Sequence, residues 1–169
     1  MMNRAAATEY PLSPALEFLQ RLWELNHALE RLSGDMASRL GITAQQRLII
    51  RCLGRYPGMP AGALAMLLRV DPGTISAALR RLEAKGLVER RRDARDQRRA
   101  SLGLTAKGRA LDRPASGTVE SAVDRLLEAA APADLEATAR VLAQLTAQLR
   151  AEVVERRSVG PAPGDAEAP

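Results

Sequence analysis

Apolar side chains recur at helical intervals near both ends of this 169-residue chain, with alternating steps of four and three residues in the first stretch. The first such stretch contains Phe18, Leu22, Leu25, Leu29, Leu32 and Met36. The second has heptad-like spacing and contains Leu135, Leu142, Leu145, Leu149 and Val153. This period places the apolar residues on one stripe of an α-helix. Aromatic residues make up only 2% of the chain, so an aliphatic core of packed helices is favoured over a β-sandwich.

Between these stripes the sequence predicts further helices, each with a start or stop signal. Thr43 and Gln46 have the spacing of a capping box. Asp71 followed by Pro72 predicts a helix start, because aspartate caps the free N–H groups and proline fits the first helical position. That helix extends to Lys85, and its inner face is expected to carry Ile75, Ala78, Leu79 and Leu82.

A β-hairpin is predicted directly after this helix. Residues 87–91 and 98–104 alternate as strands, and residues 93–97 form a polar turn between them. Thr105 is expected to cap the next helix, and Pro114 predicts a kink or a break in it. A last helix is expected from Pro132. The predicted fold class is mainly α with a small β-hairpin.

The whole net charge of +5 lies in one window. Residues 69–99 contain ten basic and five acidic residues, and the rest of the chain carries equal numbers of each sign. Six of the ten are arginines between positions 90 and 99. Such a concentration favours a polyanionic partner over the alternative of a solvated surface.

Four motifs in and around this window resemble one family when they are taken together. They are VDPGTIS at 70–76, LEAKGLV at 82–88, DQR at 96–98 and LTAKG at 104–108. The combination resembles the MarR (multiple antibiotic resistance) regulators, with matching element order from about Leu16 to Val153. The chain departs from the family pattern at Pro60, where a polar cap is more usual, and at Ala77, where a larger polar residue is common.

The resemblance implies a winged helix-turn-helix transcriptional repressor or activator that binds double-stranded, pseudo-palindromic operator DNA as a homodimer. It assigns a dimerisation helix (15–42), a winged helix-turn-helix DNA-binding lobe (43–104) and two further dimerisation helices (105–157). Composition predicts an irregular arm before them (1–14) and a disordered tail after them (158–169). The resemblance also implies that a wing-tip arginine enters the minor groove, with Arg98 in that place and Asp96 orienting it. The expected DNA-binding residues are Pro72, Gly73, Thr74, Ser76, Ala77, Arg80, Arg81, Arg95, Asp96, Arg98 and Arg99.

Many such regulators release DNA when a small phenolic or anionic effector binds. Trp23 and His27 lie four residues apart on one helix face, where packing at the dimer interface is favoured over a role as a pocket wall. Arg47 and Arg51 share the same spacing; a solvated stripe is the favoured interpretation, and contact with an anionic effector is the alternative.

Other classes of protein fit the sequence less well. One cysteine and one histidine exclude an internal disulfide and argue against metal sites and histidine-based triads, and no enzyme or cofactor motif occurs. The longest apolar run is far shorter than a membrane span and no signal peptide is evident, so a cytoplasmic protein is expected. Cys52 lies on an apolar helix face, which favours a packing role over redox sensing. A winged-helix module for protein interaction is the other alternative.

Overall fold

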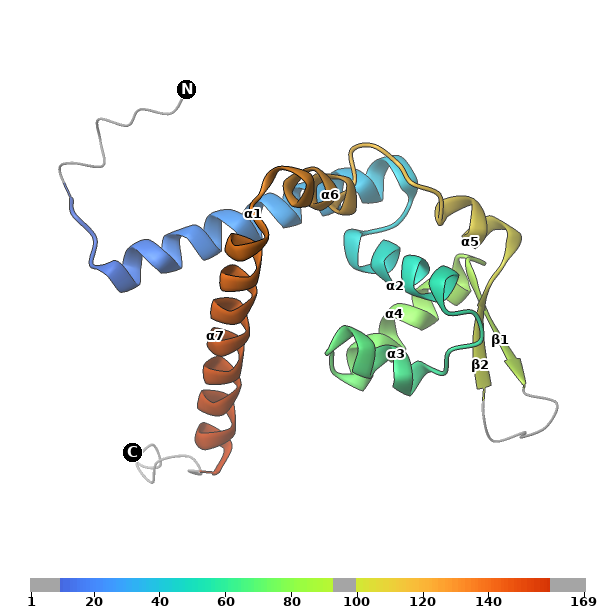
Figure 1. Ribbon diagram of the computed structural model, residues 1–169. Coiled ribbons are helices and arrows are strands. Elements are labelled where there is room, and N and C mark those ends of the chain that lie inside the picture. Colours follow the sequence, from blue (N-terminus) through green and yellow to red (C-terminus); the bar gives the residue numbers. More distant parts are fainter. Residues whose placement is uncertain (1–9, 93–99, 159–169) are drawn as a thin grey trace, which may run out of the picture. The chain divides into compact units, whose positions relative to one another are not determined.

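The computed structural model describes residues 10–92 and 100–158, drawn in colour in Figure 1. The chain divides into two compact units, Met1–Ala122 and Val123–Pro169. Among the described residues, none of the helices combines the length and the apolar character that a membrane crossing requires.

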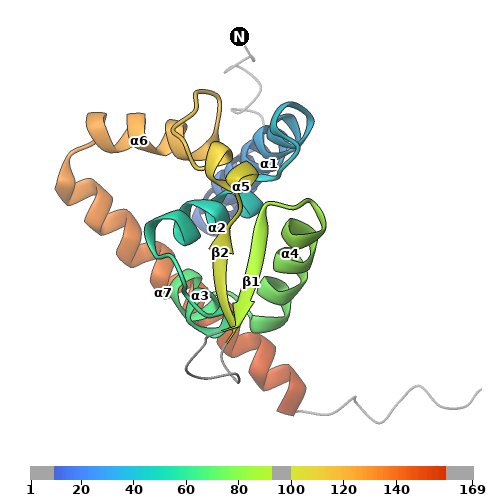
Figure 2. The same ribbon diagram turned by 90° about the vertical axis from the view of Figure 1, so that its right-hand side faces the viewer.

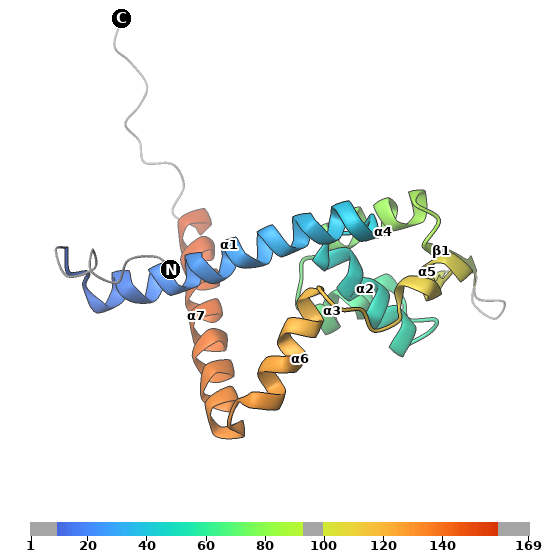
Figure 3. The same cartoon turned by 90° about the horizontal axis from the view of Figure 1, so that it is seen from above.

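The first helix, α1 (Pro14–Leu40), is long and mostly exposed. It begins at Ser13, whose Oγ accepts a hydrogen bond from the Leu16 N–H, and it ends at Gly41, which has a φ of +71°. Met36 near its C-terminal end is buried. The N-terminal part of α1 extends away from α2, α3 and α4, as Figures 1 and 3 both show. Its apolar stripe therefore has little to pack against within this unit.

Three short helices form a lobe around one aliphatic core. They are α2 (Ala44–Arg55), α3 (Ala61–Leu68) and α4 (Pro72–Ala84). The predicted capping box at the start of α2 is confirmed, with Thr43 and Gln46 each bonding the other's backbone. The expected inner face of α4 is also confirmed, since its four apolar residues are buried. Sequence spacing groups Leu48 with Ile49, Cys52 and Leu53 on one apolar face of α2, but this grouping is wrong for Leu48, which is 51% exposed, whereas Ile50 is fully buried.

The predicted hairpin is confirmed and closes one side of this core. Strands β1 (Val88–Arg92) and β2 (Ala100–Leu104) are antiparallel, with Val88 opposite Leu104 and Arg90 opposite Leu102. Val88, Leu102 and Leu104 are buried in the same cluster as the helices. Figure 2 shows β1 next to α4 and β2 next to α2, and both of these pairs are in contact.

The helix predicted after Thr105 is broken, as Pro114 indicated. α5 (Ala106–Leu111) ends before a linker of residues 112–118, and α6 (Val119–Ala129) follows it. Thr118 starts α6: its Oγ1 accepts from the Ser121 N–H, and Ser121 Oγ accepts from the Thr118 N–H. The last helix, α7 (Pro132–Ser158), begins at the predicted proline. Most apolar side chains along α6 and α7 are exposed in the single chain.

Candidate nucleic-acid interface

Helix α4 is anchored on one side and exposed at its N-terminus. Asp71 Oδ2 accepts hydrogen bonds from the N–H groups of Gly73 (2.8 Å) and Thr74 (3.3 Å). This confirms Asp71 as the N-cap and satisfies two of the donors that a helix start leaves free. Pro72 occupies the first turn, where a missing N–H costs nothing. The buried inner face fixes the helix, so its opposite face turns to solvent.

That outer face carries the side chains predicted for it. Thr74, Arg80 and Arg81 are exposed, and Ser76 and Ala77 are half-buried. Pro72 and Gly73 are exposed as well, and the first turn contains no acidic residue. Within the described part of the chain, neither Arg80 nor Arg81 has a carboxylate partner. On the face away from the core the helix therefore presents two positive charges that no carboxylate of the described residues pairs with.

Two arginines on the first strand of the hairpin, Arg90 and Arg91, differ because each has a carboxylate partner. Arg90 Nε lies 2.6 Å from Glu83 Oε1, which connects β1 to the last turn of α4. Arg91 Nη2 lies 2.5 Å from Glu89 Oε1 on the same strand. Both ion pairs are partly exposed, and exposed ion pairs contribute little to folding stability. The predicted wing residues Arg95, Asp96, Arg98 and Arg99 lie outside the described residues.

The base of the hairpin is bonded to the turn between α2 and α3 and to the turn that follows α4. The N–H of Leu102 donates to the Met59 carbonyl (3.1 Å), and the N–H of Gly58 donates to the Leu102 carbonyl (3.0 Å). Thr105 Oγ1 donates to the Gly86 carbonyl (2.7 Å). At Gly108 a side chain would collide with the Leu87 carbonyl, so only glycine permits this close approach. The hairpin and α4 are thus held as one rigid surface.

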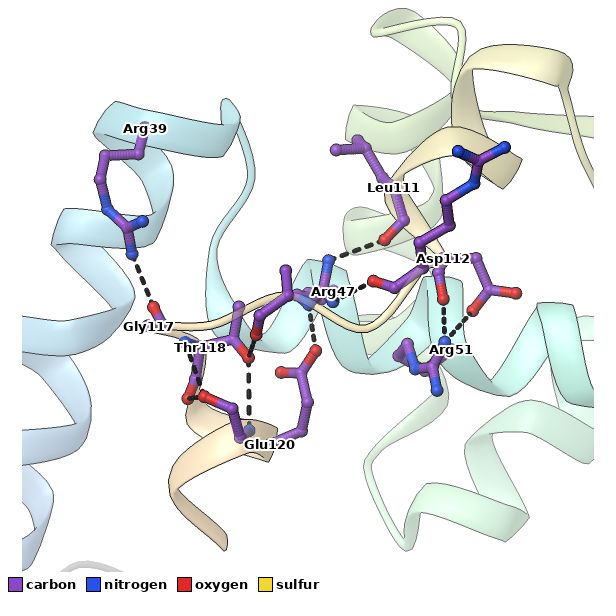
Figure 4. A network of polar contacts seen from close by, with 11 residues as sticks. Arg39, Arg47, Arg51, Leu111, Asp112, Gly117, Thr118 and Glu120 are labelled. Atoms are coloured by element: carbon purple, nitrogen blue, oxygen red, sulfur yellow. Dashed lines mark hydrogen bonds and ion pairs between the residues drawn. The ribbon is translucent and has the colours of Figure 1, made fainter. Parts of the chain in front are cut away.

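A second polar cluster, the linker clamp, involves Arg39, Arg47 and Arg51 and the linker after α5 (Figure 4). Arg47 is 1% exposed and forms an ion pair with Glu120. It also donates to the carbonyls of Leu111 (2.7 Å) and Arg113 (2.8 Å). Its guanidinium therefore binds acceptors on both sides of the linker.

The other two arginines of the clamp bind the linker itself. Arg51 Nη1 lies 2.8 Å from Asp112 Oδ1 and also donates to the Asp112 carbonyl. Arg39 Nη2 donates to the Gly117 carbonyl (2.6 Å). Gly117 has a φ of +66°, and a side chain there would meet the Arg39 guanidinium. The linker is consequently attached to α1 and α2 along its length.

These contacts correct the interpretation of Arg47 as part of a solvated stripe, which is wrong. Its acceptors lie 64 to 73 residues further along the chain, so local sequence could not identify them. One signal was available: Arg47 is three residues before Ile50, on the buried side of α2. Glu120 and Asp112 were not predicted as partners because nothing in their own surroundings marks them.

The four predicted effector residues line neither of two cavities found in the described part of the chain. Trp23 is 67% exposed and His27 is exposed on α1. A cavity of about 420 Å³ lies at the base of the hairpin, between α2, β2 and α5. Another of about 660 Å³ lies beside the first turns of α1. Neither of these two cavities is lined by Trp23, His27, Arg47 or Arg51.

Cys52 is partly buried against the core of the lobe. Burial raises the pKa of its thiol, which lowers the fraction of reactive thiolate. This environment fits the packing role and gives no support to redox sensing. Among the described residues, no three His, Cys, Asp or Glu side chains are grouped so that they could hold a metal ion.

Comparison with known proteins gives consistent matches. The sequence model of the MarR family matches residues 42–100. The HTH-type transcriptional repressor Rv2887 of Mycobacterium tuberculosis is 34% identical over 115 residues, which are 68% of this chain and 72% of that protein. The HTH-type transcriptional regulator TtmR of Methylorubrum extorquens is 36% identical over 85 residues, or 50% of this chain, and the match spans only 44% of its length.

A solved structure shows the same fold. The MepR protein of Staphylococcus aureus, crystallised as a complex with DNA, superposes with a TM-score of 0.63. The match covers 79% of this chain and 97% of that one, at 24% sequence identity. The helix-turn-helix lobe, its hairpin wing and the flanking helices thus form a winged helix-turn-helix architecture.

Proposed function

The chain belongs to the MarR family of helix-turn-helix transcriptional regulators, and from that premise we propose that it binds a pseudo-palindromic operator DNA as a homodimer. The observation that carries the proposal is the outer face of α4. Arg80 and Arg81 are exposed there and have no carboxylate partner among the described residues, and the small side chains of Thr74 and Ser76 lie on the same face. Small residues near a helix N-terminus allow close approach to base edges in the major groove, while arginines reach bases or phosphates.

The wing supplies the second part of the proposed interface. Arg98, with Asp96, Arg95 and Arg99 around it, follows the family's wing-tip pattern in the sequence. A guanidinium at that tip enters the minor groove, where the negative potential of a narrow groove attracts it. This contact adds affinity through charge and carries little sequence information.

The homodimer is supported by the apolar side chains that the long helices leave exposed. Trp23 and Leu25 on α1 are 67% and 53% exposed, and Leu149 and Val153 on α7 are 58% and 53% exposed. Leu25, Leu149 and Val153 belong to the stripes at the two ends of the sequence, and Trp23 adjoins the stripe residue Leu22. We propose that a second copy of the chain covers them. A dimer of this kind presents two α4 helices related by a two-fold axis, which requires a palindromic site.

Binding isotherms with an operator selected from genomic fragments, and with random DNA, test the proposal across a salt series. Arg98→Ala is expected to weaken binding to both DNAs. It is also expected to lower the slope of log affinity against log salt concentration by about one unit. At least one of Thr74→Ala, Ser76→Ala and Arg80→Ala is expected to reduce the binding free energy for the operator by about 1–3 kcal/mol, and that for random DNA by much less.

Arg55→Ala is the matched control, because Arg55 is exposed on α2 and contacts Tyr56. It removes the same charge and is expected to preserve the preference for the operator. A wing variant with full affinity for both DNAs contradicts the placement of the wing on the duplex. A wild-type chain that shifts no DNA at low salt overturns the proposal and favours a protein-interaction module.

We further infer that a small phenolic or anionic effector modulates DNA binding, as the family resemblance implies. Arg51 retains 40% exposure and is the more accessible of the two arginines, while the donors of Arg47 are occupied by protein groups. Thermal unfolding and operator release with a panel of aromatic carboxylates test this inference, and Trp23→Ala and His27→Ala test the alternative role of these two residues as a wall of the effector pocket. If no compound of the panel shifts the unfolding temperature or releases the operator, the inference is contradicted for aromatic carboxylates.

A further inference from the structure

The linker clamp lies outside the DNA-contacting face, yet it holds the segment that leads from the lobe to the last two helices. We propose that Arg47 is a positioning residue for operator recognition: it fixes where α6 begins on the lobe, and so sets the spacing of the two α4 helices in the dimer. This inference rests on the proposed function, because the spacing matters only when two copies bind one operator.

The break in the helix creates the need for such a residue. An unbroken helix from residue 106 to residue 129 would transmit its direction through its own backbone hydrogen bonds. Here Pro114 and the non-helical residues 112–118 interrupt that path. Side chains must therefore fix the start of α6, and Thr118 only closes the end of the helix itself.

Arg47 is the residue that spans the break. Its Nη1 and Nη2 hold the carbonyls of Leu111 and Arg113 before and after the end of α5, and its Nε binds Glu120 in the first turn of α6. All three acceptors surround one planar, buried guanidinium, whose donors have a fixed geometry. A movement of α6 relative to α2 would break at least one of these bonds and leave a buried charge poorly paired.

The surrounding contacts support the same geometry. The carboxylate of Asp112 lies against the bare backbone of Gly54, where a side chain would collide with it, and Arg51 holds it there. At the other end of the linker, Arg39 binds the Gly117 carbonyl. The lobe thus provides a preformed seat for the linker, and Arg47 is the central and most buried residue of that seat.

The matched pair Arg47→Met and Arg55→Met separates this role from charge and from general stability. Both residues lie on α2, and both variants lose one positive charge. Hydrogen exchange is expected to accelerate in residues 111–122 of Arg47→Met, with protection retained in α4 and β2. The ratio of operator to random-DNA affinity is expected to fall about tenfold. Arg55→Met is expected to change neither quantity.

Glu120→Ala is the second variant, which keeps the test decisive if Arg47→Met does not fold. Glu120 is 33% exposed, and its loss leaves Arg47 bound to the two carbonyls. Glu120→Ala is expected to accelerate hydrogen exchange in the same segment as Arg47→Met does, and to lower the ratio of operator to random-DNA affinity by a smaller factor. An unchanged ratio in a variant with a loosened linker overturns the inference, as does equal weakening on both DNAs with faster exchange throughout the lobe.

Failure of the proposed function is seen separately. A wild-type chain with no preference for any operator removes the role in half-site spacing. In that case hydrogen exchange still tests the clamp. Unchanged exchange in residues 111–122 of Arg47→Met would show that Arg47 does not hold the linker, whereas faster exchange confined to that segment would show that it does.

Discussion

The helix-turn-helix lobe and the long helices place their apolar side chains in opposite ways. In the lobe Ile49, Leu64 and Leu79 are completely buried by other residues of the same chain. Along α1 and α7 the stripe residues Leu25 and Leu149 are more than half exposed. The lobe therefore closes its own core, whereas the long helices need a further surface. Stability and assembly should consequently respond to different substitutions.

The largest expected effect is in the core of the lobe. Leu79→Ala should lower the free energy of unfolding by about 2–5 kcal/mol, because it leaves a cavity under α4. Urea unfolding followed by circular dichroism measures the change. A loss below 1 kcal/mol would mean that the lobe does not depend on this core, and the contrast between the two regions would disappear.

The next effect should appear in assembly. Leu25→Asp places a charge in the stripe of α1 and should weaken dimerisation by at least about 2 kcal/mol, because a charge in the centre of an apolar interface loses its water. Light scattering across a dilution series measures the mass. Leu48→Asp is the control, since Leu48 is a half-exposed leucine on α2 outside the stripes. A dimer equally stable in both variants would remove α1 from the interface.

Helix caps offer a smaller and sharper comparison. Asp71→Ala should lower lobe stability by about 0.5–2 kcal/mol, because it removes the acceptor of two N–H groups. Ser13→Ala should cost less, since Ser13 accepts one longer bond (3.4 Å) at an exposed helix start. The unfolding midpoints of the two variants test the order. The reverse order would indicate that α1 is anchored more firmly than the lobe.

The smallest effect is expected at Cys52. Because burial raises the pKa of the thiol, less thiolate is present at neutral pH and alkylation should be slower than for a free cysteine peptide. The difference in alkylation rate between Cys52 and the peptide should become smaller as the pH rises through the thiol pKa. Cys52→Ala should leave DNA binding before and after mild peroxide treatment unchanged. Reversible loss of binding in the wild type alone would restore the redox alternative.

Much of the fold was predictable because its signals are local. The cap at Asp71, the capping box at Thr43 and the break near Pro114 each depend on a few neighbouring residues, and all three are confirmed. The outward face of α4 followed from helical spacing alone. Spacing was less successful on α2, where Leu48 and Ile50 are two residues apart and both could have completed an apolar face.

The sequence by itself determined the helices, the hairpin, the position of the charge window and the side of α4 that faces solvent, because periodicity and capping act over one or two turns. Only the tertiary structure decided the role of Arg47. Its partners Leu111, Arg113 and Glu120 come from a distant part of the chain, and a buried arginine is stable only when such partners surround it. The same side chain in a solvated helix would be indistinguishable in sequence.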